Sequence, residues 1–253
     1  MFHRFMNPFR QLVLLFAVGN LSVAGAAEVV VSAASSLTQA FQEMAVQYES
    51  KYPDTKIRLN FAASGVLLQQ IINGAPVDVF ASADTDTMEK AIAKSLVRAA
   101  DSSLFTTNRL VLIAPVQSTV QLKQLSDLKN PDTKRIAMGV AASVPAGHYA
   151  LGSLQKAGLW NEVKDKIIYT QNVKQALDYV VRGEVDAGFV YASDAQLMLN
   201  KVRVAFVVDT STPIQYPIAR TTTTLQPEAA NKFIAFVQSP AGQAVLKKHG
   251  FGH

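Results

Sequence analysis

The sequence predicts an α/β fold of two lobes, each a mixed, mostly parallel sheet flanked by helices, with a ligand cleft between the lobes. Three observations predict it. Short apolar runs of strand type alternate with helical runs, which is βαβ patterning. The alternation occurs in two successive sets, before and after about residue 115. Small residues and hydroxyls, rather than charges, stand where strands lead into helices.

The first residues have the layout of a secretory signal peptide and are set aside before the fold is considered. Arg4 and Arg10 are followed by an apolar core at residues 12–18 and a small-residue cleavage region at residues 24–27. The apolar core is shorter than the roughly 20 residues that a membrane-spanning helix needs. A buried N-terminal helix is the alternative, but no acidic residue precedes Glu28.

The composition of the remaining chain excludes several classes of protein. Removing residues 1–27 from the 253-residue chain leaves 226 residues and lowers the formal charge from +5 to +3, since two arginines and no acidic residue are lost. This mild charge, with no basic block, gives no argument for nucleic-acid binding. The chain has no cysteine, so neither disulfides nor a thioether-linked lipid anchor is expected. We expect a free monomer in the periplasm, with no membrane anchor.

The first set of elements runs from residue 29 to residue 115. Apolar strand-type runs are followed by segments of helical pattern. Strands are expected at residues 29–32, 56–61, 77–82 and 108–115, and helices at residues 37–52, 66–73 and 86–94.

The second set begins with the apolar run "RIAMGV" and repeats the same alternation. Its strands are expected at residues 135–140, 167–170, 187–191 and 204–208, and its helices at residues 146–157, 173–182 and 194–199. A single helical segment at residues 227–249 is expected to close the chain. From this organisation we expect a signal peptide at residues 1–27, a first lobe from residues 28–109 and 217–253, and a second lobe from residues 110–216. Ligands of such sheets bind beyond the carboxyl ends of the strands.

The stretch "SAASSLTQAF" places bare hydroxyls where the first strand leads into the first helix. Ser36 and Gln39 have the spacing of a capping box, in which the serine caps the helix. The alternative is that the exposed N–H groups of this helix start receive an anion.

The same arrangement recurs at three further helix starts. Ser64 and Gly65 lie between a strand and a helix in "FAASGVLLQQI". In "VPAGHYALGSL" a proline suits the first helical position, and the backbone of Ala146 follows with almost no side chain in the way. In "QNVKQALDYVV" Asn172 is a plausible cap, and the N–H of Val173 stands at the exposed first turn. Four such starts, two in each lobe, indicate an anion held by helix starts and hydroxyls.

Tyr191 ends the apolar strand "AGFVY", at the sheet edge where ligands bind, although it could equally be a core tyrosine. Asp84 is expected to cap the next helix, and Asp78 is interpreted as structural. His148 stands alone, without the second histidine, cysteine or paired carboxylate that a metal site needs. No direct cation ligand and no cofactor are expected.

Enzyme signatures are missing from the sequence. It contains no G-x-S-x-G elbow, no P-loop and no G-x-G-x-x-G fingerprint. An exported hydrolase with Ser36 or Ser64 as nucleophile is the rival class, but neither serine has a His–Asp or lysine partner motif. A binding protein rather than an enzyme is therefore expected.

Five stretches, in this order, resemble the periplasmic molybdate-binding proteins of ABC uptake systems. They are "AASSLTQAF", "FAASGVLLQQIINGAPVDVFASAD", "SVPAGHYALGSLQKAG", "NVKQALDYVVRGEVDAGFVYASDA" and "SPAGQAVLKKHGF". The resemblance covers essentially the whole chain after the signal segment. It implies the two-lobed type II periplasmic-binding fold, closing on a tetrahedral oxyanion.

The resemblance also implies a ligand set. The family uses two serines from the first lobe, which fall on Ser36 and Ser64, and backbone N–H groups from the second, which fall on Ala146 and Val173. A tyrosine hydroxyl falls on Tyr191. A serine stands just before Ser36 where alanine is common in the family, which leaves open which of the two touches the ligand; we expect Ser36.

The function implied is the capture of molybdate, and also of tungstate, for delivery to an inner-membrane ABC permease. Molybdenum would be held as molybdate by the same five residues. The alternative is a binding protein for another tetrahedral oxyanion, such as sulfate or thiosulfate, on the same fold.

Overall fold

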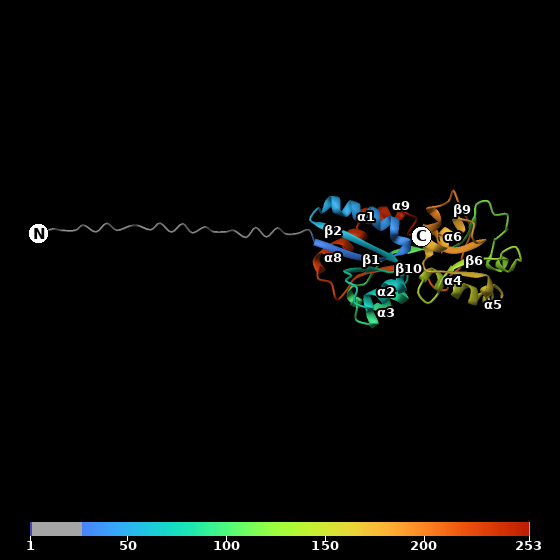
Figure 1. Cartoon of the computed structure of the whole chain (residues 1–253), viewed down its shortest axis with the longest axis horizontal. Helices are drawn as coiled ribbons and strands as arrows, with labels where there is room; N and C mark the ends of the chain where they lie inside the picture. The colour runs from blue at the N-terminus through green and yellow to red at the C-terminus, as the bar shows by residue number, and fades with distance from the viewer. Residues whose placement is uncertain (2–26, 253) are drawn as a thin grey trace.

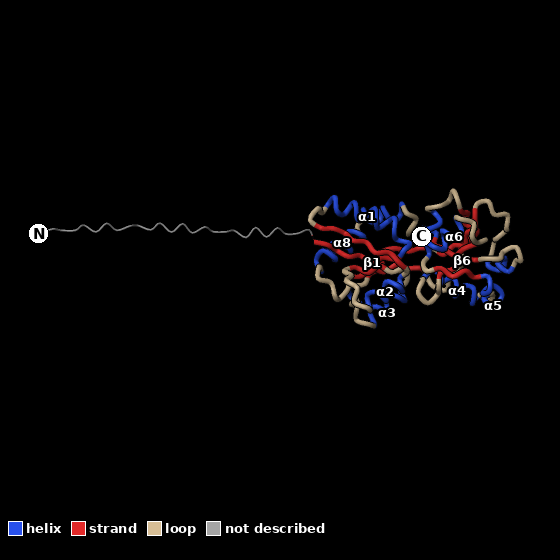
Figure 2. Tube along the Cα trace, viewed as in Figure 1, coloured by secondary structure: helices blue, strands red, loops and turns tan. Residues whose placement is uncertain are grey.

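The computed structural model describes Met1 and residues 27–252, so nearly all of the expected signal segment lies outside the described residues. The described chain forms two sheets side by side, each with helices on both faces (Figure 1, Figure 2). The expected α/β fold is confirmed.

The first sheet is mixed and has the strand order β2-β1-β3-β10-β4. Strand β1 pairs in parallel with β2 and β3, whereas β10 is antiparallel to β3 and β4. Its strands are β1 (Ala27–Ala34), β2 (Thr55–Ala62), β3 (Val79–Ala81), β4 (Ser103–Asn108) and β10 (Ile214–Arg220).

Helices cover both faces of this sheet (Figure 1). One face carries α1 (Thr38–Lys51), α8 (Pro227–Gln238) and α9 (Pro240–Lys248). The other carries α2 (Ser64–Ile72) and α3 (Thr85–Ala93), over a core cluster that includes Leu67, Phe80 and Met88.

The second sheet has the order β7-β6-β8-β5-β9, with β6 parallel to β7 and β8, and β5 antiparallel to β8 and β9. Its strands are β5 (Leu110–Pro115), β6 (Ile136–Gly139), β7 (Ile167–Thr170), β8 (Ala187–Tyr191) and β9 (Val202–Val207). Helices α4 (Pro145–Lys156) and α5 (Trp160–Val163) lie on one side, α6 (Val173–Val181) on the other, and α7 (Ala192–Gln196) follows β8. Short 3₁₀ turns are η1 (Ser35–Leu37), η2 (Ala99–Asp101), η3 (Leu125–Lys129) and η4 (Lys164–Lys166).

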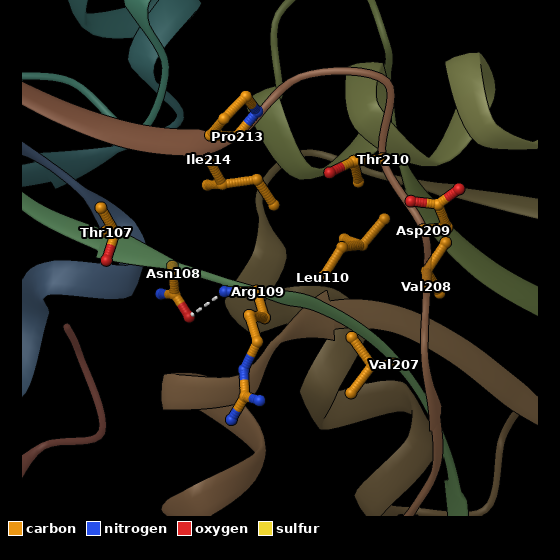
Figure 3. Close-up of a pocket in the computed structure, with 10 residues that line it drawn as sticks. All are labelled: Thr107, Asn108, Arg109, Leu110, Val207, Val208, Asp209, Thr210, Pro213 and Ile214. Atoms are coloured by element: carbon orange, nitrogen blue, oxygen red, sulfur yellow. Dashed lines mark hydrogen bonds between the residues drawn. The ribbon is translucent and has the colours of Figure 1, made fainter. Parts of the chain in front are cut away.

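The chain passes twice between the sheets, once from β4 to β5 through Arg109 and once through residues 208–213 between β9 and β10. The two crossings line an open pocket with about 820 Å³ of space outside the protein atoms, open solvent included (Figure 3). Strand β10 begins at Ile214, within the range expected for the second lobe, and pairs there with β4. The expected boundaries of the lobes stay a prediction.

Two strands were not expected from the sequence. Strand β4 is rich in serine and threonine and carries no long apolar run. Strand β10 contains Pro217, which normally argues against a strand. In the structure the register shifts between Tyr216 and Pro217, so the proline sits at an irregularity in the ladder.

The expectation of a single terminal helix over residues 227–249 is wrong. The chain breaks at Ser239, which is extended (φ −68°, ψ 162°) and caps α9 by accepting the N–H of Gly242. Pro240 then takes the first position of α9. A residue before proline is pushed out of the helical region, so the pair Ser239–Pro240 ends one helix and starts the next.

Within residues 27–252, no helix is both long enough and apolar enough to cross a membrane.

Candidate oxyanion site

A small cavity lies where the two sheets meet, at the starts of helices from both. It contains about 190 Å³ of space outside the protein atoms, open solvent included, and most of its lining residues are small. The eleven residues that line it are Ala34, Ser35, Ser36, Ala63, Ser64, Ala83, Val144, Pro145, Ala146, Val173 and Tyr191. All five residues predicted to bind a ligand are therefore brought together, although their roles as ligands stay a prediction.

The expected capping box at Ser36 is wrong. Ser36 lies in the 3₁₀ turn η1, and α1 begins at Thr38 with Leu37 at its N-cap and no side-chain cap. The Ser36 hydroxyl instead lies 3.0 Å from the hydroxyl of Tyr216 on β10, and the Gln39 amide oxygen accepts from Lys174. The Ser36 side chain is thus paired with the distant residue Tyr216 and does not cap the helix that follows it.

A chain of donors ends at Ser36. The backbone N–H of Arg109 donates to the Asn108 amide oxygen (2.9 Å, Figure 3), which fixes the orientation of that amide. The Asn108 NH₂ group then donates to Ser193 at 2.8 Å and to the Tyr216 hydroxyl at 3.3 Å. The Tyr216 hydroxyl accepts from Asn108 and can donate its own hydrogen to Ser36, and in that arrangement the hydrogen of Ser36 is left for the cavity. Neither Asn108 nor Tyr216 carries a local signal in the sequence that marks it as part of the site.

Ser64 is oriented in the same way. It is fully buried at the first position of α2, and its Oγ accepts the backbone N–H of Ala83 at 3.0 Å. With the oxygen occupied by a donor, the hydroxyl hydrogen is available to a ligand.

The start of α4 supplies backbone donors from the second sheet. Pro145 takes the first helical position and has no N–H, so the N–H of Ala146 is the first that this helix presents. The helix packs tightly on β6, because a Cβ at Gly147 would lie 2.0 Å from the Gly139 carbonyl oxygen. The position of the Ala146 amide is therefore fixed by the backbone itself.

The start of α6 adds another backbone donor. Asn172 is the N-cap, as expected, and its side chain accepts the N–H of Gln175 at 3.0 Å. The N–H of Val173, at the first helical position, has no partner within the helix and borders the cavity.

Tyr191 is buried at the end of β8, and its hydroxyl lies 3.5 Å from the Ala83 carbonyl oxygen. Burial raises the pKa of Tyr191 well above its usual value, and the nearby Tyr216, Tyr149, Asp84 and Asp194 reinforce the shift. The hydroxyl therefore keeps its proton and remains a donor. Its contact with Ala83 is long enough to give way to an anion.

No lining residue carries a charged side chain. Asp194, on α7 three residues after Tyr191, is fully buried. Burial raises the pKa of Asp194 to about 7, against the opposing effect of Lys174. Burial also lowers the pKa of Lys174, whose ammonium donates to Gln39 at 2.7 Å.

The arrangement suits binding of an anion rather than nucleophilic catalysis. Hydroxyls and helix N-termini converge on one small space, and such N-termini favour negative charge. The lining contains no histidine, lysine or carboxylate that could act as a base for Ser36 or Ser64. His148 lies elsewhere, more than half exposed, with Nε2 3.6 Å from an Asp86 carboxylate oxygen. Asp84 caps α3, as expected, and Asp78 accepts the Val30 N–H, which is a structural role.

The fold and this site define a two-lobed solute-binding protein. The sequence profile of the family described as "Bacterial extracellular solute-binding protein" matches residues 29–252. The chain belongs to this family.

Relatives with known names cover nearly the whole chain. The molybdate-binding protein ModA of Escherichia coli is 34% identical over 99% of both chains, and that of Haemophilus influenzae is 34% identical over 94% of this chain and 95% of the relative. A Bacillus subtilis protein named as a putative ABC transporter substrate-binding lipoprotein is 37% identical over 87% of this chain and 85% of its own.

Solved structures agree with this placement. The substrate-binding domain of a putative molybdenum ABC transporter from Clostridium difficile is 36% identical, with a TM-score of 0.68 over 89% of this chain and 98% of that one. The periplasmic molybdate-binding protein of Azotobacter vinelandii has a TM-score of 0.80 at 22% identity, covering 89% of this chain and 99% of its own. At that identity the likeness shows the fold, which confirms the expected periplasmic-binding architecture.

Proposed function

We propose that this protein captures molybdate, and also tungstate, in the cavity between its lobes and delivers the ion to an inner-membrane ABC permease. The observation that carries the proposal is the cavity itself. Serine and tyrosine hydroxyls and helix starts from both lobes converge on one small space that is lined by no charged side chain.

The proposed ligands are the hydroxyls of Ser36, Ser64 and Tyr191 and the backbone N–H groups of Ala146 and Val173. Hydrogen bonds to a charged group contribute about 1.5–3 kcal/mol each, and each helix dipole adds about 0.3–1 kcal/mol. Together they can offset the cost of removing a dianion from water. Ser35 also borders the cavity, and Ser36 is preferred because its hydroxyl is held by Tyr216.

The relatives support molybdate as the solute, since proteins named for that ion are 34% identical over almost their full length. The layout of residues 1–27 as a signal peptide supports export to the periplasm, where we propose that the chain acts as a free monomer. We propose binding without turnover, in keeping with a family of solute-binding proteins.

Native mass spectrometry of the purified protein, exposed to an equimolar mixture of molybdate, tungstate, sulfate and phosphate, tests the proposal. We expect one molybdate or tungstate ion per chain. Selective retention of sulfate would replace the proposal by a sulfate-binding protein on the same fold.

A further inference from the structure

At the rim of the cavity the two lobes meet backbone to backbone. The N–H of Gly65, on α2, donates to the carbonyl oxygen of Ser143, in the loop between β6 and α4, at 3.0 Å. Gly65 directly follows Ser64, and Ser143 stands three residues before Ala146. The contact therefore joins the two segments that carry proposed ligands from opposite lobes.

Close approach, rather than backbone conformation, requires glycine at position 65. The residue lies in the first turn of α2 and does not have the positive φ that favours glycine. A Cβ placed there would lie 2.8 Å from both the Cα and the carbonyl oxygen of Ser143. These are main-chain atoms, so no rotamer change at position 143 can relieve the clash.

The loop side of this contact is held rigidly. The N–H groups of Ser143 and Val144 both donate to the Val140 carbonyl oxygen, at 3.0 and 2.8 Å. Val144 is also packed against β6, since a Cβ at Gly139 would lie 2.4 Å from its side chain. The carbonyl of Ser143 therefore has little freedom to move away.

The helix side is held as well. The Ala83 N–H donates to Ser64 Oγ at 3.0 Å, and the Leu67 N–H donates to the Ala63 carbonyl oxygen at 3.0 Å. Gly65 and Ser143 are both fixed within their own lobes. A clash between them can therefore be relieved only if the two lobes move apart.

We propose that the contact between Gly65 and Ser143 is the mechanical stop of lobe closure, and that it sets the size of anion the cavity can hold. This inference rests on the proposed function. A methyl group at position 65 stops closure early, so Ser64 and Ala146 no longer reach the same anion together. The loss is greater for sulfate, which is smaller than molybdate and needs a tighter closure.

Gly65→Ala tests the stop, with Gly152→Ala as the matched control, because a Cβ at Gly152, in α4, would meet no atom within 4 Å. Calorimetric titration should show molybdate binding at least ten-fold weaker in Gly65→Ala, a larger loss for sulfate, and no change in the control. Gly65→Ser should lose more than Gly65→Ala. The melting temperature without anion should not fall, since open lobes avoid the clash.

Lobe separation is measured independently of affinity. The chain has no cysteine, so spin labels at Glu89→Cys in α3 and Gln155→Cys in α4, both exposed, report one distance between the lobes. The shortest separation sampled should be longer in Gly65→Ala than in the labelled parent and the control.

Either of two results would overturn the proposal that the Gly65–Ser143 contact limits closure. One is molybdate binding by Gly65→Ala within two-fold of the parent. The other is an unchanged shortest distance between the two spin labels. A fall in the melting temperature of Gly65→Ala without anion would also count against it. If the parent does not bind molybdate, the proposed function fails, while the label distances still decide whether the stop exists.

Discussion

The hydroxyls of the cavity differ in what already occupies their oxygens. Ser64 accepts a backbone N–H from Ala83, and Ser36 is paired with Tyr216, whose own oxygen accepts from Asn108. Tyr191 faces the Ala83 carbonyl and so acts as a donor. At the scale of single residues, the protein gives the hydroxyls of Ser36 and Ser64 partners of its own, and an arrangement in which Tyr216 donates leaves the hydrogens of both serines to the ligand.

Tyr216→Phe should therefore weaken molybdate binding although Tyr216 does not line the cavity. Loss of its hydroxyl releases Ser36 from its fixed orientation, at a cost of about 1 kcal/mol, or about five-fold in affinity. In a Ser36→Ala background the same substitution should have almost no further effect. A double-mutant cycle measured by calorimetry checks this coupling.

Tyr48→Phe is the control for the cycle, because Tyr48 is equally buried in the first lobe but lies on α1, away from the cavity. It should leave affinity unchanged. Additive effects of Tyr216→Phe and Ser36→Ala would show that the two hydroxyls act independently.

At the scale of elements, α7 places the carboxylate of Asp194 in the interior. Its pKa of about 7, raised by burial, means that the folded chain keeps a proton that the unfolded chain releases near pH 4. Folding therefore takes up a proton between about pH 4 and pH 7. Ionisation of Asp194 destabilises the folded state as the pH rises through that window, and the effect is complete above about pH 8.

Asp194→Asn should remove this cost, because the amide stays neutral. The free energy of unfolding of Asp194→Asn, relative to the parent, should rise by about 2–3 kcal/mol between pH 5 and pH 8. Urea unfolding across this range measures it. Asp178→Asn, which changes an exposed carboxylate on α6, is the matched control for removing a charge at the surface. A constant difference between Asp194→Asn and the parent would mean that Asp194 does not titrate in this range.

Local sequence signals predicted the elements that are governed by local physics. The apolar run of β8 and the cap at Asn172 were both expected and are present. Strand β10 was not expected. Its proline is tolerated only because the pairing of β10 with β4, which is distant in the sequence, is irregular at that point.

The candidate site divides in the same way. The helix starts at Ala146 and Val173 carry local signals, and the resemblance pointed to Ser36, Ser64 and Tyr191. The partner of Ser36 lies 180 residues away, and the match of Gly65 to Ser143 exists only across the two lobes. Contacts of this kind depend on the assembled fold, so the sequence could not reveal them.

On the scale of the whole molecule, the lobes are in contact on several sides of the cavity. Besides the Gly65–Ser143 bond, Lys174 on α6 reaches Gln39 on α1 at 2.7 Å, and His148 on α4 lies 3.6 Å from Asp86 on α3. The structure therefore has the closed arrangement, in which an enclosed anion meets donors from both lobes at once. An anion that bridges the lobes favours this state over an open one.

The central claim is that the closed cavity meets its ligand mainly with hydrogen-bond donors, and competition calorimetry with phosphate tests it most directly. Near neutral pH phosphate carries at least one proton, which needs an acceptor, whereas molybdate, tungstate and sulfate are proton-free dianions. A buried phosphate O–H without an acceptor costs about 1–3 kcal/mol. With molybdate bound at pH 7, tungstate should displace it readily, sulfate less well and phosphate poorly. Phosphate displacing molybdate as readily as tungstate does would contradict a cavity built mainly of donors.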